Sequence, residues 1–272
     1  MTYGQICVAL ENAGIDNYRY EARLLIEELC GSFSEEEDYP SRTLSEAVIR
    51  RCERYPLQYI LGKWWFARCE LEVNESCLVP RPDTELIVEL AQKLLPKEAC
   101  FADLCTGSGC IAVATLDLRP DTSADAYELY PDTLALATRN AEKNRVAERF
   151  HPVLGDVLVP ELLGEKKYAA ILSNPPYIRS DVIPTLDAEV KKEPHAALDG
   201  GEDGLIFYRA IMKNFAKNLD VGGFFLFEIG FDQANDLKMI AEENGFSCEI
   251  YKDLGGCDRA ALCRINDSNK FL

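Results

Sequence analysis

Short apolar segments alternate with segments of helical spacing from about residue 82 to residue 265. The apolar segments are typical of strands buried on both faces, and the stretches between them are long enough for crossover helices. Such alternation predicts an α/β fold with an open, doubly wound, mostly parallel sheet covered by helices on both faces. The expected strands are residues 100–105, 123–127, 150–154, 168–173, 223–229, 247–251 and 260–265, and the expected helices are residues 82–95, 110–118, 131–143, 205–219 and 231–244.

The chain before this pattern has a different character. Residues 1–62 show helical spacing without strand signals, which predicts a small all-helical domain. Within it, Thr43 and Glu46 form a capping-box pattern that predicts a helix start. Residues 63–81 contain short apolar runs and predict a hairpin linker to the domain of residues 82–272.

The charge of the chain limits its partners. It contains 46 Asp and Glu residues against 29 Lys and Arg residues, which gives a formal net charge of −17. Proteins that hold nucleic acid by its phosphates depend on clustered basic side chains, so we expect no direct nucleic-acid partner. No apolar run approaches the length of a membrane span, so we also expect no membrane partner.

The 11 cysteines do not form a metal-binding pattern. No two of them have CxxC spacing, and His151 and His195 are far apart in the sequence. Because a zinc site needs several close ligands, we expect no metal. The odd number of cysteines favours free thiols in a reducing cytoplasm, which is the expected location.

Residues 103–109 (DLCTGSG) connect an expected strand to an expected helix. Glycines let the backbone adopt a positive φ and approach a ligand closely, and open α/β sheets bind ligands at the carboxyl ends of their strands. The segment has neither the three glycines of a dinucleotide fingerprint nor the Lys-Ser or Lys-Thr of a phosphate loop. A tight turn without a ligand is the alternative interpretation. The candidate binding residues are Asp103, Cys105, Thr106, Gly107, Ser108 and Gly109.

Two acidic residues follow the next strands. Glu128 lies about 20 residues after the glycine turn, where a carboxylate can accept hydrogen bonds from the ribose hydroxyls of an adenosine. Asp156, after the following strand, could contact the adenine amino group. The alternatives are a surface acid for Glu128 and a common Gly-Asp turn for Asp156.

Residues 174–177 (Asn-Pro-Pro-Tyr) directly follow the expected strand 168–173. Two consecutive prolines lock φ and remove two N–H donors, which leaves backbone carbonyls without competing donors beside them. Asn174 adds a side-chain carbonyl, and Tyr177 adds an aromatic wall. The segment predicts a rigid set of acceptors for a planar NH₂ group, and a proline-rich loop without function is the alternative.

These motifs resemble those of known methyltransferases. The glycine turn resembles motif I of S-adenosylmethionine-dependent methyltransferases, and residues 174–177 resemble the motif of enzymes that methylate amide or exocyclic nitrogens. In combination with further segments, the chain resembles the release factor glutamine (N5) methyltransferases over nearly its whole length. Those segments are residues 56–62 (PLQYILG), 78–85 (LVPRPDTE), 193–205 (EPHAALDGGEDGL), 227–230 (FEIG) and 252–259 (KDLGGCDR).

The resemblance implies a fold, a reaction and partners. The fold is a seven-stranded, Rossmann-like class I methyltransferase domain at residues 82–272, with a substrate-recognition domain at 1–62 and a hairpin linker at 63–81. The methyl donor is S-adenosylmethionine, and the product is S-adenosylhomocysteine. The substrate is the glutamine of the Gly-Gly-Gln motif in class 1 peptide chain release factors, whose methylation modulates translation termination. We expect a monomer.

The resemblance also assigns roles to residues. Residues 105–109 would line the methionine end of the cofactor, Glu128 would hold the ribose, and Asp156 and Val157 would flank the adenine. Asn174, Pro175, Pro176 and Tyr177 would bind the glutamine amide, and Asn174 would also contact the cofactor. The sequence departs from the family pattern at Glu128, where Asp is more usual, and at Val157, where many relatives have an aromatic residue.

One mechanistic hypothesis follows. An amide nitrogen is a weak nucleophile because its lone pair is delocalised into the carbonyl. We expect Asn174 Oδ1 and the Pro175 carbonyl each to accept one N–H of the substrate, which orients the nitrogen and stabilises the developing positive charge. Tyr177 completes the expected catalytic set. No general base is expected, because neither histidine lies in a suitable motif.

Other interpretations of the sequence stay open. A nucleic-acid adenine-N6 or RNA-guanine methyltransferase is the alternative enzyme, because the same acceptors suit exocyclic amines. A non-enzymatic adaptor and a nicotinamide oxidoreductase fit the motifs less well. Arg81, Thr84 and Glu85 fit either a substrate-facing linker or a capped helix start. The aromatic run 64–66 fits interdomain packing better than a partner-facing patch.

Overall fold

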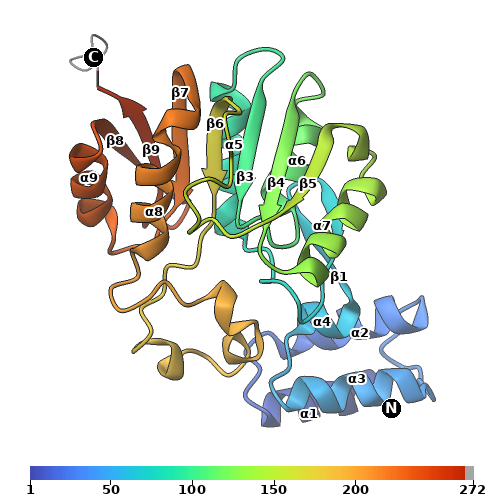
Figure 1. Cartoon of the computed structure of the whole chain (residues 1–272). Coiled ribbons are helices and arrows are strands. Elements are labelled where there is room, and N and C mark those ends of the chain that lie inside the picture. The colour runs from blue at the N-terminus through green and yellow to red at the C-terminus, as the bar shows by residue number, and fades with distance from the viewer. Residues whose placement is uncertain (267–272) are drawn as a thin grey trace.

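The computed structural model describes residues 1–266, and Figure 1 shows their arrangement. Leu10, Leu25 and Leu44 come from three different helices of the N-terminal region and are fully buried in one hydrophobic cluster. Gly31 ends the second helix with a φ of 84°, a conformation that glycine adopts without steric cost. The first four helices are α1 (Tyr3–Asn12), α2 (Tyr18–Cys30), α3 (Arg42–Cys52) and α4 (Leu57–Leu61).

The predicted capping box at Thr43 is wrong. Helix α3 begins at Arg42, and the Ser41 hydroxyl caps it by accepting a hydrogen bond from the Leu44 amide at 3.2 Å. Ser41 has the extended backbone that an N-cap requires, whereas Thr43 already lies in the first turn. Both residues are good caps two positions apart, so the sequence pattern alone could not choose between them.

An antiparallel hairpin, β1 (Lys63–Phe66) and β2 (Cys69–Glu72), follows the helical region. Phe66 is buried in the main core, as the packing interpretation of the aromatic run expects. Trp65 points the other way and is 62% exposed. Successive residues of a strand face opposite sides, so Phe66 packs in the core while its neighbour Trp65 lies at the surface.

The main sheet has seven strands in the order β5-β4-β3-β6-β7-β9-β8. The first five strands in this order are parallel, and the last two are antiparallel to their neighbours. The predicted seven-stranded, mostly parallel sheet is confirmed. Its strands are β3 (Cys100–Leu104), β4 (Ser123–Glu128), β5 (Phe150–Leu154), β6 (Tyr168–Ser173), β7 (Leu219–Glu228), β8 (Phe246–Lys252) and β9 (Asp258–Ile265).

Helices cover both faces of this sheet. On β3, Phe101 belongs to the hydrophobic cluster built with α5, α6 and α7, whereas Ala102 belongs to the cluster built with α8 and α9. Leu226 and Phe227 of β7 divide in the same way. The strands are apolar on both sides for this reason. The helices are α5 (Glu85–Leu94), α6 (Cys110–Leu118), α7 (Pro131–Lys143), α8 (Ile206–Phe215) and α9 (Ala234–Glu243).

The order of the strands reverses between β3 and β6, which are neighbours in the sheet. Open α/β sheets bind ligands in the crevice that forms outside the carboxyl ends of the strands at such a point. In Figure 1 the N-terminal helices and the segment 178–205 lie at the same lower end of the molecule. None of the helices within residues 1–266 has the length and apolar character needed to cross a bilayer.

Candidate active site

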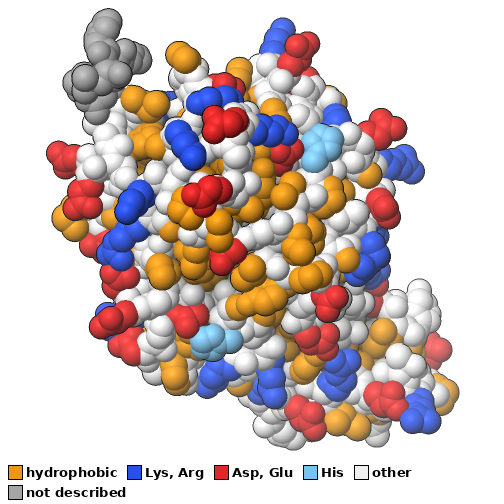
Figure 2. All heavy atoms as spheres, in the orientation of Figure 1, with side chains coloured by type: hydrophobic (Ala, Val, Ile, Leu, Met, Phe, Trp, Pro, Cys, Tyr) orange, Lys and Arg blue, Asp and Glu red, His pale blue; other side chains and the backbone are white. Residues whose placement is uncertain are grey.

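A cavity of about 380 Å³ lies at the reversal point of the sheet. Its walls come from the loops after β3, β4, β5 and β6, from the linker before α5 and from the segment 194–199. This volume lies within the range of small-molecule sites. Figure 2 shows hydrophobic side chains gathered near the middle of one face, with charged side chains mainly around them. The predicted residues that line the cavity are Cys105, Thr106, Gly107, Ser108, Glu128, Asp156, Val157, Asn174 and Pro176.

Asp103 lies beneath the glycine loop and not on the cavity surface. Its Oδ2 accepts hydrogen bonds from the Thr106 hydroxyl at 2.6 Å and from the Ala112 amide at 3.2 Å, which joins the loop to α6. Burial raises the pKa of the Asp103 carboxyl to about 7, and these two hydrogen bonds oppose the shift. Asp103 therefore shapes the loop from below.

The loop after β3 has an unusual backbone. Cys105 has a φ of 59°, a conformation that costs most residues about 1–2 kcal/mol, and Gly107 and Gly109 follow with φ of 57° and 81°. A Cβ on Gly109 would lie 3.2 Å from Ala137 Cβ, so this glycine lets α6 pack against α7. Gly109 does not line the cavity, whereas Gly107 does.

Glu128 ties the second strand to the glycine loop. It is 8% exposed, and its Oε2 accepts a hydrogen bond from the Gly107 amide at 3.0 Å. Its Oε1 accepts from the amides of Leu129 and Tyr130 at 2.8 and 3.2 Å. The side chain, one methylene longer than Asp, spans the gap between the two loops and still presents its carboxylate to the cavity.

Asp156 and Val157 form the part of the wall that follows β5. Asp156 Oδ1 accepts a hydrogen bond from the Leu158 amide at 2.8 Å, which fixes the turn. Val157 is buried and belongs to the hydrophobic cluster of α8 and α9. This wall is therefore acidic at one residue and apolar at the next.

The loop 174–177 presents Asn174 and Pro176 to the cavity. The Asn174 Nδ2 donates a hydrogen bond to the Thr84 hydroxyl at 3.3 Å, while no residue of the described chain donates to its Oδ1. Pro175 is buried. Tyr177 is not the aromatic wall that the sequence predicted, because its hydroxyl turns away from the cavity and donates to Glu228 Oε1 at 3.1 Å.

The backbone of Tyr177 is in close contact with Gly200, Gly204 and Gln233. Gly200 and Gly204 approach it so closely that a Cβ on either residue would collide with it. Gln233 Nε2 donates a hydrogen bond to the Tyr177 carbonyl at 3.0 Å. The loop is therefore fixed by contacts with segments that are far away in the sequence.

The structure shows the contacts of the linker residues Arg81, Thr84 and Glu85, whose role the sequence did not decide. Arg81 lines the cavity and forms an ion pair with Glu193, whose other oxygen accepts from the Val79 amide at 2.9 Å. Glu85 accepts a hydrogen bond from the Ala67 amide at 2.9 Å and so holds the hairpin. Of the three residues, Arg81 and Thr84 line the cavity, and Glu85 is structural.

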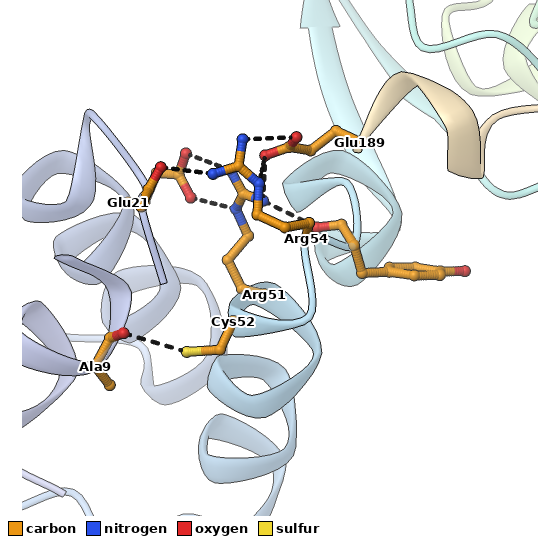
Figure 3. A network of polar contacts seen from close by, with 8 residues as sticks. Ala9, Glu21, Arg51, Cys52, Arg54 and Glu189 are labelled. Atoms are coloured by element: carbon orange, nitrogen blue, oxygen red, sulfur yellow. Dashed lines mark hydrogen bonds and ion pairs between the residues drawn. The ribbon is translucent and has the colours of Figure 1, made fainter. Parts of the chain in front are cut away.

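A buried ionic network joins the helical region to the segment beside the cavity (Figure 3). Arg51 of α3 pairs with Glu21 of α2 at 2.5 Å and with Glu189 at 3.0 Å, and Arg54 pairs with Glu189 at 2.8 Å. Although burial acts in the opposite direction, the hydrogen bonds from both arginines lower the pKa of the Glu189 carboxyl. Glu189 therefore anchors segment 178–205 to α3 and the turn after it, and Arg51 extends the network to α2.

Comparisons with known proteins identify the family. A family model described as PrmC N-terminal domain matches residues 4–62, and one described as Methyltransferase small domain matches residues 82–203. The release factor glutamine methyltransferase of Geobacter sulfurreducens is 41% identical over 220 residues, which cover 80% of this chain and 76% of that protein. The chain belongs to the release factor glutamine methyltransferase family.

A second relative extends the match to nearly the full length. The release factor glutamine methyltransferase of Moorella thermoacetica is 36% identical and covers 95% of each chain. Among solved structures, a methyltransferase from Pyrococcus furiosus superposes with a TM-score of 0.54 at 19% identity, over 72% of this chain and 87% of that one, which shows the fold alone. The resemblance of the chain to the release factor glutamine methyltransferases is confirmed.

In this member of the release factor glutamine methyltransferase family, the cavity also contains residues to which the sequence assigned no role. Leu129 and Tyr130 directly follow β4, so their place at a strand end was a usable signal. His195 and Asp199 also line it, with 3.8 Å between His195 Nδ1 and Asp199 Oδ2. Their position depends on how segment 178–205 folds back, which no local pattern indicates.

Proposed function

We propose that this protein transfers a methyl group from S-adenosylmethionine to the side-chain amide nitrogen of a glutamine in a peptide chain release factor. The observation that carries the proposal is the Asn174 amide, whose Nδ2 is held by Thr84 while Oδ1 is left to accept from a ligand in the cavity. The names of the relatives support glutamine in a release factor as the substrate.

The cavity residues fit S-adenosylmethionine. The backbone of residues 105–108 borders the cavity, and Glu128 and Asp156 offer carboxylate oxygens with lone pairs left for ribose and amino groups. Val157 and Leu129 give an apolar surface for a purine ring. When bound, S-adenosylmethionine supplies an electrophilic methyl group on a sulfonium sulfur and leaves as S-adenosylhomocysteine.

The loop 174–177 would orient the substrate amide. Asn174 Oδ1 and the Pro175 carbonyl each accept one N–H of the glutamine, which points the nitrogen lone pair toward the donor. Fixed orientation of this kind can contribute up to about 7–11 kcal/mol to catalysis. The same oxygens stabilise the positive charge that develops on nitrogen, because they need not reorganise during the reaction. The nitrogen then releases one of its two protons to water, which leaves a neutral N-methyl amide.

We place the substrate glutamine in the Gly-Gly-Gln segment of a class 1 release factor. The two glycines before the glutamine carry no side chains, which favours entry of the segment beside Arg81 and His195, two residues that line the cavity. In Figure 1 the N-terminal helices lie at the same lower end of the molecule as segment 178–205, which carries His195, so they would contact the same partner.

One experiment tests the proposal against its nucleic-acid alternative. The full chain is incubated with methyl-labelled S-adenosylmethionine and a purified class 1 release factor, and in parallel with DNA or RNA. Mass spectrometry then maps the label, which we expect on one glutamine of the release factor. Label on nucleic acid only, or on another kind of residue, would overturn the proposal.

A further inference from the structure

Gln233 is a buried side chain to which the proposed reaction gives no role. It directly precedes α9 as the N-cap residue and is 7% exposed, yet its side chain makes no capping hydrogen bond to that helix. It does not line the cavity either. Its amide is directed instead at backbone groups of three other segments.

Three hydrogen bonds join the Gln233 amide to these segments. Its Nε2 donates to the carbonyls of Tyr177 at 3.0 Å and Gly204 at 3.2 Å, and its Oε1 accepts from the Gly230 amide at 2.9 Å. A backbone carbonyl can only accept and a backbone N–H can only donate, so these partners allow one orientation of the side chain. The loop after β6, segment 178–205 and the turn after β7 are thereby joined at one residue.

The bond to Tyr177 holds the backbone of the loop that carries Asn174. Within residues 1–266, no other side chain makes a hydrogen bond to the backbone of residues 174–177. Pro175 and Pro176 each have a fixed φ, so few torsions are free between the Tyr177 carbonyl and Asn174. A displacement of the Tyr177 carbonyl is therefore expected to move Asn174 and Pro175 as well.

The carbonyls of Tyr177 and Gly204 converge on the same nitrogen. A Cβ on Gly204 would collide with the Tyr177 oxygen, so the two backbones lie in direct contact at this point. Without the NH₂ group of Gln233, both oxygens would be left without this donor. A buried carbonyl that loses its donor is unfavourable, so the loop would shift.

We infer that Gln233 is a positioning residue that holds the loop 174–177 where Asn174 Oδ1 and the Pro175 carbonyl can accept from the substrate amide. The inference rests on the proposed function, which assigns those two oxygens. Gln233 acts through the loop backbone, three residues away from Asn174. A misplacement of about 1 Å at a reacting group can cost about a hundredfold in rate, so a small shift of this loop is sufficient.

The first test removes the hydrogen bonds of Gln233 and keeps a side chain of similar length. We expect Gln233→Met to lower kcat about tenfold to a hundredfold, because the loop shifts when the Tyr177 carbonyl loses its donor. The dissociation constant for S-adenosylmethionine, measured by calorimetry, should not change, because Gln233 does not line the cavity. An unchanged kcat would overturn the inference.

Asn218 provides the matched control. It is also buried, and its Nδ2 donates to the carbonyls of Gly164 at 3.0 Å and Lys166 at 2.7 Å, so it too joins two backbone carbonyls. It directly precedes β7, at the end of the sheet opposite to the loop after β6. We expect Asn218→Leu to lower the free energy of unfolding, as Gln233→Met does, and to leave kcat unchanged. An equal fall of kcat in both variants would trace the effect to lost stability and overturn the inference.

The second test asks whether Gln233 acts through the loop. Asn174→Ala removes one of the two acceptors, so in that background a shifted loop can misplace only the Pro175 carbonyl. We expect the double variant with Gln233→Met to lose less kcat than the product of the two single losses. Losses that multiply would overturn the inference. If Gln233→Met does not fold, Gln233→Glu replaces it in both tests, because Glu lacks the NH₂ group but keeps an acceptor for the Gly230 amide.

The two proposals fail in different ways. Wild-type protein is assayed beside every variant with the same release factor. Absence of methyl transfer by the wild type would overturn the proposed function, whereas an active wild type with an equally active Gln233→Met variant would overturn only the role of Gln233.

Discussion

A Cβ on Gly200 would lie 2.7 Å from the Cα of Tyr177, closer than real Cβ atoms approach other atoms. Gly200 belongs to segment 178–205, and Tyr177 ends the loop that follows β6. The backbone of this loop is therefore seated against another backbone, with no side chain between them. Its position should depend on the size of residue 200.

Gly200→Ala tests this dependence. The added methyl would collide with the backbone of Pro176, Tyr177 and Gly204, which must shift, so we expect a loss of about 1–3 kcal/mol in the free energy of unfolding and a lower kcat. Gly4→Ala is the matched control, because a Cβ on Gly4 of α1 meets no atom within 4 Å. Urea unfolding and methyl transfer measure both effects, and equal behaviour of the two variants would contradict the packing argument.

Asn174→Ala tests the acceptor role of Asn174. We expect kcat to fall at least about a hundredfold, because one preorganised oxygen at the reacting nitrogen is lost. Affinity for S-adenosylmethionine should change little, since most of the cavity that would hold it is intact. Single-turnover methyl transfer and calorimetry separate the two quantities, and near-normal turnover would refute the role.

Glu128→Ala tests the ribose assignment. We expect the affinity for S-adenosylmethionine to fall about tenfold to hundredfold, because a charged acceptor and the contact with the Gly107 amide are both lost. Glu142→Ala removes an exposed acid of α7 and serves as the control. Calorimetric titrations that give the same affinity for both variants would place the ribose elsewhere.

Arg51→Ala tests the network that joins the helical region to segment 178–205. Removal of the arginine leaves Glu21 unpaired and leaves Glu189 with Arg54 alone, both at largely buried positions, so we expect a loss of about 3 kcal/mol in the free energy of unfolding. Arg42→Ala removes a surface pair with Glu46 from the same helix and should have no measurable effect. Similar unfolding midpoints for the two variants would show that the network does not stabilise the fold.

The pH dependence of stability should report on Asp103. Its pKa is raised from 3.8 to about 7 in the folded chain, so the folded state binds the proton more tightly than the unfolded state. Stability is therefore expected to decrease as the pH rises from about 4 to about 7 and then to level off. The total loss from this group is at most about 4 kcal/mol.

The variant Asp103→Asn isolates this contribution because it cannot ionise. Urea unfolding of wild type and variant is measured at several pH values between 4 and 8. We expect the wild type to lose stability relative to the variant as the pH rises through this range. A constant difference between the two proteins would show that Asp103 has an ordinary pKa.

Local patterns were sufficient for much of the fold. The expected helices at residues 110–118 and 131–143 coincide with α6 and α7, and each of the seven expected strands has a counterpart in the sheet. Helix 131–143 has a clear apolar period, whereas helix 110–118 and the central strands are continuous apolar runs that end at turn residues, so tertiary contacts reinforce the local preference. The glycine turn was found because it directly follows a buried strand.

The supporting contacts of the site were not predictable in this way. Asn174 contacts Thr84 over 90 residues of sequence, and Arg81 contacts Glu193 over 112. The role of Tyr177 was misjudged because the direction of its ring depends on Glu228, 51 residues away. Such contacts depend on how whole helices, strands and loops pack together, and no local sequence pattern indicates them.

Segment 178–205 is attached at three places: at Glu189 to the helical region, at Glu193 to the linker, and at Gly200 to the loop that carries Asn174. The cavity wall formed by residues 194–199 of this segment is therefore held at a fixed position relative to Asn174. A side chain presented from outside must therefore be long enough to reach Asn174 past this wall. An asparagine offered on the same partner loop would stop one methylene short of the acceptors.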